Sequence, residues 1–287
     1  QEDQMNRWTT LICCVVAFSA CASMGRKGQV KVDTAPIHYA VQGTGGPVVV
    51  FDAGAGDDMT SWKGIVGQVS QHAVTFAFDR PGYGAHFGVD NAFDTDADGK
   101  RTAVEMAEHL RAALQAAGLA PPYVLVGHSL GGLNMVAFAK LFPRDVQGVV
   151  LVDGRPPAFT EACREAGVKA FIVPGWLTWT MKEHVRREMR GIEDSEQFVA
   201  DPPAYGTLPI TVMAANRPDT FLTSEESQRF WVRKQQEFAA SLANGRFVEV
   251  TSTHYIHHEQ PAQVITEILR IVEGGAEGAA RGAKSPT

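Results

Sequence analysis

Short runs of continuous apolar residues recur along this chain and alternate with longer amphipathic stretches. Four such runs lie at 48–51, 74–78, 123–126 and 149–152. A run of this length without polar alternation is typical of a strand that is buried on both faces, as in a parallel sheet. The stretch 102–117 carries its apolar residues on one helical face and is long enough to cross between two such strands. The sequence therefore predicts an α/β fold with a mostly parallel, twisted sheet and helices on both faces.

The second half of the chain interrupts this alternation and then resumes it. Residues 155–206 combine charged, helix-prone segments with tryptophans and prolines, and we interpret them as a small helical cap inserted into the core. The alternation resumes with a strand at 209–214, a helix at 225–242, a strand at 247–250 and a helix at 261–272. The predicted core thus comprises 29–154 and 207–273, and the Gly/Ala-rich tail 274–287 is expected to be disordered.

The N-terminus has the features of an export signal. Residues 5–7 supply a short positive region, and the apolar run 11–20 is too short to span a bilayer. The motif Phe-Ser-Ala-Cys at 18–21 resembles a bacterial lipobox, in which the cysteine carries the lipid. We predict a signal peptide over 1–20 and an exported protein, either a cell-envelope lipoprotein held to the membrane through Cys21 or a secreted one. A plain secretory signal or an uncleaved anchor is the alternative.

Cysteine content and charge argue against several other classes of protein. After loss of the signal peptide, Cys163 is the one cysteine besides Cys21, so no intramolecular disulfide is expected. The formal net charge is −6 and no Lys/Arg-rich stripe occurs, so nucleic acid is not expected as a partner.

One motif points directly to chemistry. Gly127-x-Ser129-x-Gly131 follows a predicted buried strand and precedes a helix, which is the context that a nucleophile elbow requires. The turn from strand to helix is so tight that side chains two residues before and after the serine would collide. Ser129 is thereby presented at a helix N-terminus, where the helix dipole and free N–H groups favour developing negative charge.

With this motif the chain resembles the α/β-hydrolase superfamily, in its serine esterase and lipase branch, over about residues 30 to 272. The matching segments are 51–56, 79–84, 127–132 and 253–256. The resemblance implies the α/β-hydrolase fold and a reaction that needs no cofactor. Ser at the elbow argues against haloalkane dehalogenase and epoxide hydrolase chemistry, for which these relatives use Asp.

The resemblance also implies an oxyanion hole made of two backbone N–H groups. One comes from the residue after the nucleophile, here Leu130, and the other from the loop after the first parallel strand. Counting back from Trp62, which matches a frequent family tryptophan, assigns the loop donor to Ala55. The chain departs from the family pattern at Ala53, where the relatives usually have His.

A serine hydroxyl needs a neighbouring base to become a good nucleophile. The family order places that base in a loop after the last strand, and His254 fits because a small residue precedes it and Pro261 follows. His257 and His258 are interpreted as loop or supporting residues. His128, beside the nucleophile, is expected to support the elbow.

The acid of the triad has two candidates. Most relatives carry it after the strand that corresponds to 209–214, where this chain has Asp219, one position late and without the usual Gly. A minority carry it after the preceding strand, where Asp153 stands. We favour Asp153, although an Asp at that site also occurs in relatives whose acid lies elsewhere.

An acidic loop matches the spacing of an EF-hand calcium site. Asp94, Asp96 and Asp98 precede a glycine, and Glu105 stands at the position of the bidentate ligand. No entering helix precedes the loop, and Arg101 occupies a position that is normally apolar. We therefore favour an acidic surface loop, with Glu105 in the first turn of the following helix, over a Ca²⁺ site.

These observations predict a serine hydrolase that cleaves a carboxylic ester in a small-molecule substrate. Trp176, Trp179 and Met181 of the cap are candidates for an apolar substrate pocket, although each could instead pack the cap onto the core. Aminopeptidase, thioesterase, lactonase and perhydrolase activities remain open, because the fold does not choose among them. A non-catalytic, ligand-binding homologue is the rival from a different class.

Overall fold

The computed structural model describes residues 24–32, 35–84, 99–201, 205–219 and 223–282. The predicted signal peptide 1–20 and Cys21 lie outside these residues, so export and lipid attachment stay predictions. Asp94, Asp96 and Asp98 of the acidic loop also lie outside them.

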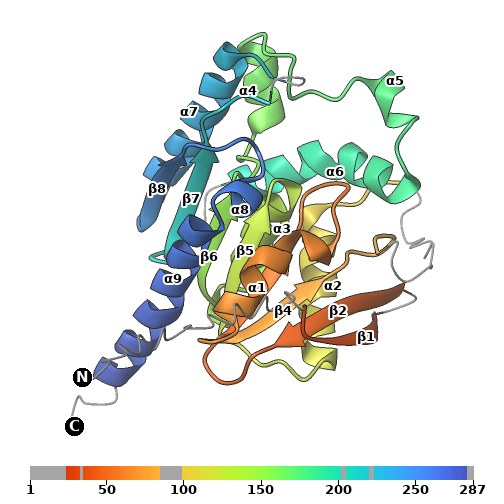
Figure 1. The fold of residues 1–287 in the computed structure, drawn as a ribbon. Coiled ribbons are helices and arrows are strands. Elements are labelled where there is room, and N and C mark those ends of the chain that lie inside the picture. The colour runs from red at the N-terminus through yellow and green to blue at the C-terminus, as the bar shows by residue number, and fades with distance from the viewer. Residues whose placement is uncertain (1–23, 33–34, 85–98, 202–204, 220–222, 283–287) are drawn as a thin grey trace, which may run out of the picture.

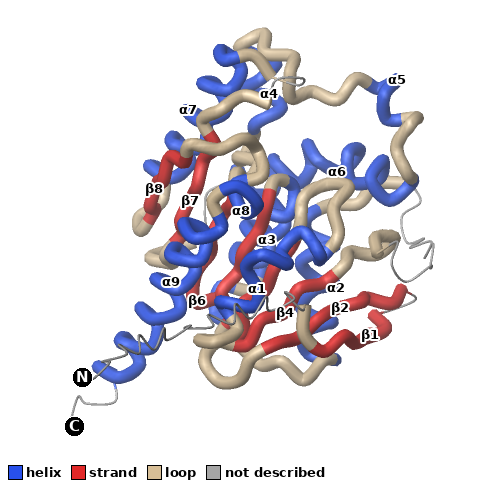
Figure 2. The backbone as a smooth tube through the Cα atoms, in the orientation of Figure 1, coloured by secondary structure: helices blue, strands red, loops and turns tan. Residues whose placement is uncertain are grey.

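Eight strands form one sheet in the order β1-β2-β4-β3-β5-β6-β7-β8. Their bounds are β1 Arg26–Val32, β2 Ala35–Gln42, β3 Val48–Asp52, β4 Val74–Phe78, β5 Tyr123–His128, β6 Val146–Val152, β7 Ile210–Ala215 and β8 Gly245–Val250. β3 to β8 run parallel to one another. β1 and β2 form an antiparallel hairpin that extends the sheet beside β4 (Figures 1 and 2). The predicted α/β-hydrolase fold is confirmed. The β1–β2 hairpin belongs to this sheet but was not among the predicted strands.

Helices cover both faces of the sheet and enclose two apolar cores. On one face, α2 (Ala103–Ala116) and α3 (Leu130–Leu141) pack against the larger core cluster. On the other face, α1 (Lys63–Val69) and α9 (Pro261–Gly282) cover the second cluster. α7 (Glu225–Ser241) packs beside β7 and β8. The central strands are therefore buried on both sides, which explains their continuous apolar sequence.

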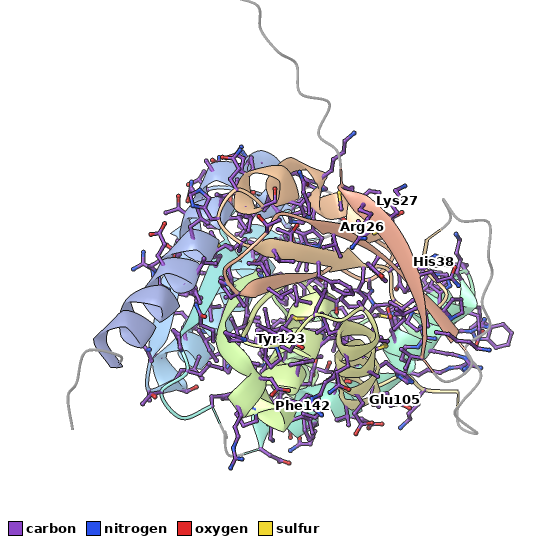
Figure 3. All side chains as sticks on the ribbon, turned by 90° about the horizontal axis from the view of Figure 1, so that it is seen from below. Arg26, Lys27, His38, Glu105, Tyr123 and Phe142 are labelled. Carbon is purple, nitrogen blue, oxygen red and sulfur yellow. The ribbon has the colours of Figure 1, made fainter. Side chains whose placement is uncertain are left out.

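Aromatic side chains fill the core on the α3 side. Tyr123 of β5 meets Phe138 of α3 at a centroid distance of 6.0 Å, and Phe138 meets Phe142 at 5.1 Å, both edge to face. Figure 3, which shows the side chains from below, labels Tyr123 and Phe142 at this layer. This packing fixes the end of α3 away from Ser129 and so helps to hold the helix in place.

The predicted cap segment leaves the core after β6 and returns at β7. It contains α4 (Phe159–Glu165), the short α5 (Gly175–Thr178) and α6 (Glu183–Ala200). α6 crosses above the sheet and contacts α2 and α3, whereas α5 stands away from the body of the molecule (Figure 1). The cap therefore has a packed base and a projecting tip.

The C-terminal segment differs from the prediction of disorder after 273. α9 continues as a helix to Gly282, and Gly275 lies inside it. A Cβ atom on Gly275 would lie 2.2 Å from the Gln147 side chain, whose Nε2 donates to Ile271 O at 2.7 Å. A glycine at this helix position makes room for the Gln147 amide, and composition alone does not reveal that contact. Within the described residues, no helix is both long and apolar enough to cross a bilayer.

Candidate active site

Ser129 lies in a strained turn between β5 and α3. Its backbone angles are φ 52° and ψ −119°, a conformation that non-glycine residues rarely adopt and that is typical of a nucleophile elbow. A Cβ atom on Gly127 would lie 2.5 Å from Gly131 O, and one on Gly131 would lie 2.4 Å from Asp52 O. Both glycines are therefore required sterically, and they bring the loop after β3 against the base of the elbow.

His254 lies beyond the end of β8 and makes a close contact with Asp153, which follows β6. The His254 Nδ1 atom is 2.6 Å from Asp153 Oδ2. Residues 101 positions apart in sequence are thus brought together at the carboxyl ends of parallel strands, which is where α/β folds place their reactive groups. In this arrangement Nδ1 carries the hydrogen that Asp153 accepts, so Nε2 remains the acceptor nitrogen.

The second oxygen of Asp153 is held by three donors. Oδ1 accepts from Ala215 N at 2.9 Å, from Trp231 Nε1 at 2.8 Å and from Gln235 Nε2 at 2.9 Å. Asp153 is 1% exposed and has a φ of 48°, which Asp tolerates better than most residues. A buried carboxylate with Oδ1 satisfied in this way is fixed with Oδ2 directed at His254.

Asp219, the alternative acid, lies near this contact without replacing it. Its backbone N–H donates to Thr223 Oγ1 at 3.0 Å, and its carbonyl accepts from Thr223 N at 3.0 Å. Its charge acts on His254, but the carboxylate hydrogen-bonded to His254 is that of Asp153. The structure thus brings Asp153, rather than Asp219, into direct contact with the imidazole.

The surroundings of His254 favour its protonated form. Burial opposes protonation, but the hydrogen bond and charge of Asp153, aided by the charges of Asp57 and Asp219, outweigh it. The pKa of His254 is therefore raised above the usual imidazole value. These carboxylates stabilise the imidazolium that forms when His254 takes up a proton. His254 is therefore a stronger base than a free imidazole.

The two predicted oxyanion donors flank the elbow. Leu130 is the first residue of α3, where a backbone N–H has no acceptor within the helix. Ala55 lies in an exposed turn closed by a hydrogen bond from Asp57 N to Gly54 O of 3.2 Å. Ala53, which replaces the usual His, is buried, and its carbonyl lies 2.6 Å from the Cβ position of Gly131.

Two other histidines, His128 and His257, are buried and pack beside His254. The His128 Nε2 atom contacts His254 O at 3.1 Å, and its ring lies 4.6 Å from the His254 ring. The His257 Nε2 atom is 2.8 Å from Ser61 Oγ, and its ring packs on Trp62. Burial, together with neighbouring histidines, lowers the pKa of His128 well below the usual value and that of His257 to about 3. Both rings are therefore neutral supports at neutral pH.

A buried ionic network that sequence reasoning did not identify lies behind the oxyanion loop. Arg80 donates to Asp52 Oδ1 at 2.5 Å and to Glu188 Oε1 at 2.8 Å. Asn134 of α3 donates to Asp52 Oδ2 at 2.8 Å. Arg80 falls within the segment 79–84 that resembles the family, so it could have been singled out. Glu188 is one charge among many on α6, and nothing in the sequence pattern distinguishes it.

Comparison with known proteins decides the family. The model of the "Alpha/beta hydrolase family" matches residues 49–267, which is well over half of the 287-residue chain. The chain belongs to the α/β hydrolase family.

Relatives of this α/β hydrolase differ in what is known of them. It is 26% identical over 221 residues to the uncharacterized protein YqjL of Bacillus subtilis, a match that covers 77% of this chain and 81% of YqjL. It is 30% identical over 125 residues to a pyrrolizixenacetamide deacetylase of Xenorhabdus hominickii, with 43% of each chain covered. The chain thus spans less than half of the deacetylase.

Solved structures share the fold at low sequence identity. A thermophilic esterase of Thermogutta terrifontis matches with a TM-score of 0.56 at 19% identity, covering 87% of this chain and 99% of the esterase. The carboxylesterase CesB of Bacillus subtilis matches with a TM-score of 0.56 at 18% identity, covering 87% and 92%. At this level of identity the similarity shows the fold of the hydrolase and not its substrate.

Glu105, which follows the acidic loop, has a structural partner. Its carboxylate accepts from Thr102 N at 2.6 Å, and Glu105 N donates to Thr102 Oγ1 at 3.4 Å, which forms a capping box at the start of α2. No group of His, Cys, Asp and Glu side chains suited to a metal ion occurs among the described residues. Glu105 thus stands in the first turn of a helix, as the surface-loop interpretation expects.

The cap residues that were predicted to form an apolar pocket lie at its tip. The side chains of Trp176 and Trp179 are 72% and 83% exposed, and Met181 is only partly buried. Trp176 lies in α5 and Trp179 ends it, and this four-residue helix stands away from the body of the molecule (Figure 1); their part in a substrate pocket stays a prediction. An exposed tip is also at odds with the alternative that these residues pack the cap onto the core.

Proposed function

We propose that this α/β hydrolase is a serine hydrolase that cleaves carboxylic esters of small molecules through an acyl-enzyme on Ser129. The observation that carries the proposal is the 2.6 Å contact of His254 Nδ1 with Asp153 Oδ2, together with the elbow geometry of Ser129, whose backbone N–H donates at 3.3 Å to Val152 O, the residue before Asp153. A fixed acid, an imidazole with a raised pKa and a strained serine are the three parts that acyl transfer needs.

In the first half-reaction, Ser129 Oγ attacks the ester carbonyl while His254 Nε2 takes up the hydroxyl proton. Asp153 holds the Nδ1–H of His254 and stabilises the imidazolium that results. The N–H groups of Leu130 and Ala55 donate to the carbonyl oxygen as it becomes negative. Collapse of the tetrahedral intermediate breaks the bond to the alcohol, which leaves with the proton from His254.

In the second half-reaction, water repeats these steps on the acyl-enzyme. His254 Nε2 takes a proton from the water as it attacks the acyl carbonyl, and the same two N–H groups hold the oxyanion. The bond to Ser129 Oγ then breaks, and His254 returns the proton to the serine. The carboxylic acid is released, and no cofactor enters either half-reaction.

The comparisons support hydrolysis of an acyl compound. Proteins that share the fold are described as esterases, and one relative is named a deacetylase. Esters and amides pass through the same tetrahedral intermediate and differ in the leaving group. We favour esters because the carbonyl of an ester is more electrophilic than that of an amide, and because expulsion of an alcohol depends less on protonation by His254 than expulsion of an amine does.

A panel of p-nitrophenyl esters of rising acyl length tests the proposal. The full chain is expected to hydrolyse at least one member with saturation kinetics, and Ser129→Ala is expected to lose about 10⁴-fold or more in kcat. Hydrolysis that survives Ser129→Ala unchanged would contradict the proposal. Turnover of anilides but no esters would replace it with amidase activity at the same site.

A further inference from the structure

The oxyanion loop is anchored on both sides of Ala55 by two buried side chains. Arg80 donates through Nη1 to Ala53 O at 2.6 Å and through Nη2 to Gly54 O at 2.9 Å. On the other side, the backbone N–H of Gly56 donates to Tyr83 Oη at 3.2 Å. Ala55, the predicted oxyanion donor, thus lies between Gly54, which Arg80 holds, and Gly56, which Tyr83 holds.

Arg80 and Tyr83 both donate hydrogen bonds to one carboxylate of the cap, that of Glu188. Glu188 of α6 accepts from Arg80 Nε at 2.8 Å and Nη2 at 3.3 Å, and it accepts from Tyr83 Oη at 2.5 Å. The Arg80 and Glu188 side chains are 1% and 2% exposed. Arg101 adds a second positive charge 3.9 Å from Glu188, and Asp52 pairs with Arg80. The cluster is thus balanced, with Asp52 and Glu188 opposite Arg80 and Arg101.

We propose that Glu188 is a positioning residue through which the cap sets the geometry of the oxyanion loop. Glu188 touches no reacting atom; it fixes the Arg80 guanidinium and the Tyr83 hydroxyl, and these fix the backbone at Ala53, Gly54 and Gly56. When α6 is seated, the loop is held with the Ala55 N–H in place. When α6 is displaced, both anchors lose their common partner. The inference about catalysis rests on the proposed function.

The same helix provides a matched control. Glu193 of α6 pairs with Arg164 through two hydrogen bonds, of 2.6 and 2.8 Å. These side chains are 52% and 54% exposed and lie away from the oxyanion loop. An exposed pair of this kind contributes little to stability or position. Glu188→Gln and Glu193→Gln therefore make the same chemical change on one helix, with and without a link to the loop.

The first test is hydrogen–deuterium exchange, which needs no substrate. In the full chain, the Gly56 amide is protected by Tyr83 and the Asp57 amide by Gly54 O. Glu188→Gln is expected to speed exchange in peptides covering 53–57, whereas Glu193→Gln leaves it unchanged. Equal exchange in both variants would overturn the coupling, whether or not the protein is an esterase.

The second test is the split between kcat and KM on the best ester of the panel. Glu188→Gln is expected to lower kcat about 10- to 100-fold, below the full loss of an oxyanion donor, with KM little changed. Inhibition by a boronic acid, whose tetrahedral adduct places an oxygen in the same hole, should weaken in parallel. A raised KM with unchanged kcat would contradict a positioning role.

A third variant tests the same link in case Glu188→Gln fails to fold. Tyr83→Phe keeps the ring and all the charges but removes the hydroxyl that joins Glu188 to Gly56. It should speed exchange at 53–57 and lower kcat by less than Glu188→Gln, and the two effects should not add in the double variant. A folded Tyr83→Phe protein with native exchange and kcat would overturn the proposal. A wild-type protein without esterase activity refutes the proposed function, while the exchange result still decides the coupling.

Discussion

Tryptophans in two regions of the molecule illustrate two ways of holding a side chain. Trp231, next to the predicted triad, is 4% exposed, packs on Phe159 and Phe171 and donates to Asp153 Oδ1. Trp176 and Trp179, at the tip of the cap, are 72% and 83% exposed. The side chains around Asp153 are fixed by packing and hydrogen bonds together, whereas the two tryptophans at the tip are largely exposed.

We propose that this difference separates the residues that carry out the chemistry from those that recognise the substrate. Groups that move protons must be held to within a fraction of an ångström, and the fixed region provides this through buried, satisfied polar atoms. Side chains at the tip are free to adjust to a bound molecule. Changes in the fixed region should therefore alter rate, whereas changes at the tip should alter substrate preference.

The largest effect is expected from the carboxylate at the centre of the fixed region. Asp153→Asn keeps the shape of the side chain but removes the charge that stabilises the His254 imidazolium, so kcat should fall by about 10⁴-fold. Asp219→Asn, which changes a charge outside the hydrogen bond, should change kcat little. Steady-state kinetics on one p-nitrophenyl ester measure both. A large loss in Asp219→Asn alone would assign the acid to Asp219.

The buried histidines should make the stability of the fixed region depend on pH. Since the pKa of His257 is lowered to about 3, the unfolded chain binds a proton between that value and about 6.5 and the folded protein does not. The free energy of unfolding should therefore fall as pH is lowered through this range, by up to about 1.4 kcal/mol per pH unit for one such histidine. His257→Asn should flatten the profile in urea denaturation.

The exposed His72 provides the control for that experiment. His72→Asn makes the same substitution at an exposed site and controls for the change of residue itself. A profile that keeps its full slope in His257→Asn would show that His257 is protonated in the folded state.

A smaller effect is expected from the tryptophan in the fixed region. Trp231→Phe keeps most of the packing but removes one of the donors to Asp153 Oδ1, and a hydrogen bond to a charged group contributes about 1.5–3 kcal/mol. Because part of this is recovered by the two remaining donors, kcat should fall about 10-fold. The same substitution at the exposed Trp176 is the control. Measurements of kcat and of the melting temperature in Trp231→Phe and Trp176→Phe test whether the loss of rate is specific to position 231.

The smallest effect on stability is expected at the tip. Trp176→Ala and Trp179→Ala remove exposed rings, so the free energy of unfolding should change by less than about 0.5 kcal/mol. The ratio of kcat/KM between long-chain and short-chain esters should change instead. A drop in stability of several kcal/mol would show that the tip is packed in solution and that the contrast with Trp231 does not hold.

The core of the fold could be predicted because its signals are local. The apolar runs of β3 to β7 follow from burial on both faces, and the elbow glycines follow from steric contacts within a few residues. The β1–β2 hairpin lies at the edge of the sheet and is only partly buried, so its residues give no continuous apolar run. The helix beyond residue 273 brings Gly275 against the Gln147 side chain, and these two residues are far apart in sequence.

The candidate active site likewise has residues that the sequence could identify and residues that it could not. The triad candidates could be named because they follow strands in a known order, although the sequence left two acids open. Glu188 could not be named, since its role arises from contact with Arg80 and Tyr83, 108 and 105 residues away. Nor does sequence show whether a tryptophan is buried, because exposure depends on how the segment around it packs.

Ser129 is proposed to be a nucleophile that His254 and Asp153 activate. Reaction with a fluorophosphonate probe, followed by intact mass and peptide mapping, tests it without knowledge of the substrate. The wild-type protein should gain one adduct, located on Ser129; Ser129→Ala should gain none, and Asp153→Asn should react much more slowly. No adduct on the folded wild-type protein, or an equal adduct on Ser129→Ala, would contradict the claim and favour a ligand-binding homologue.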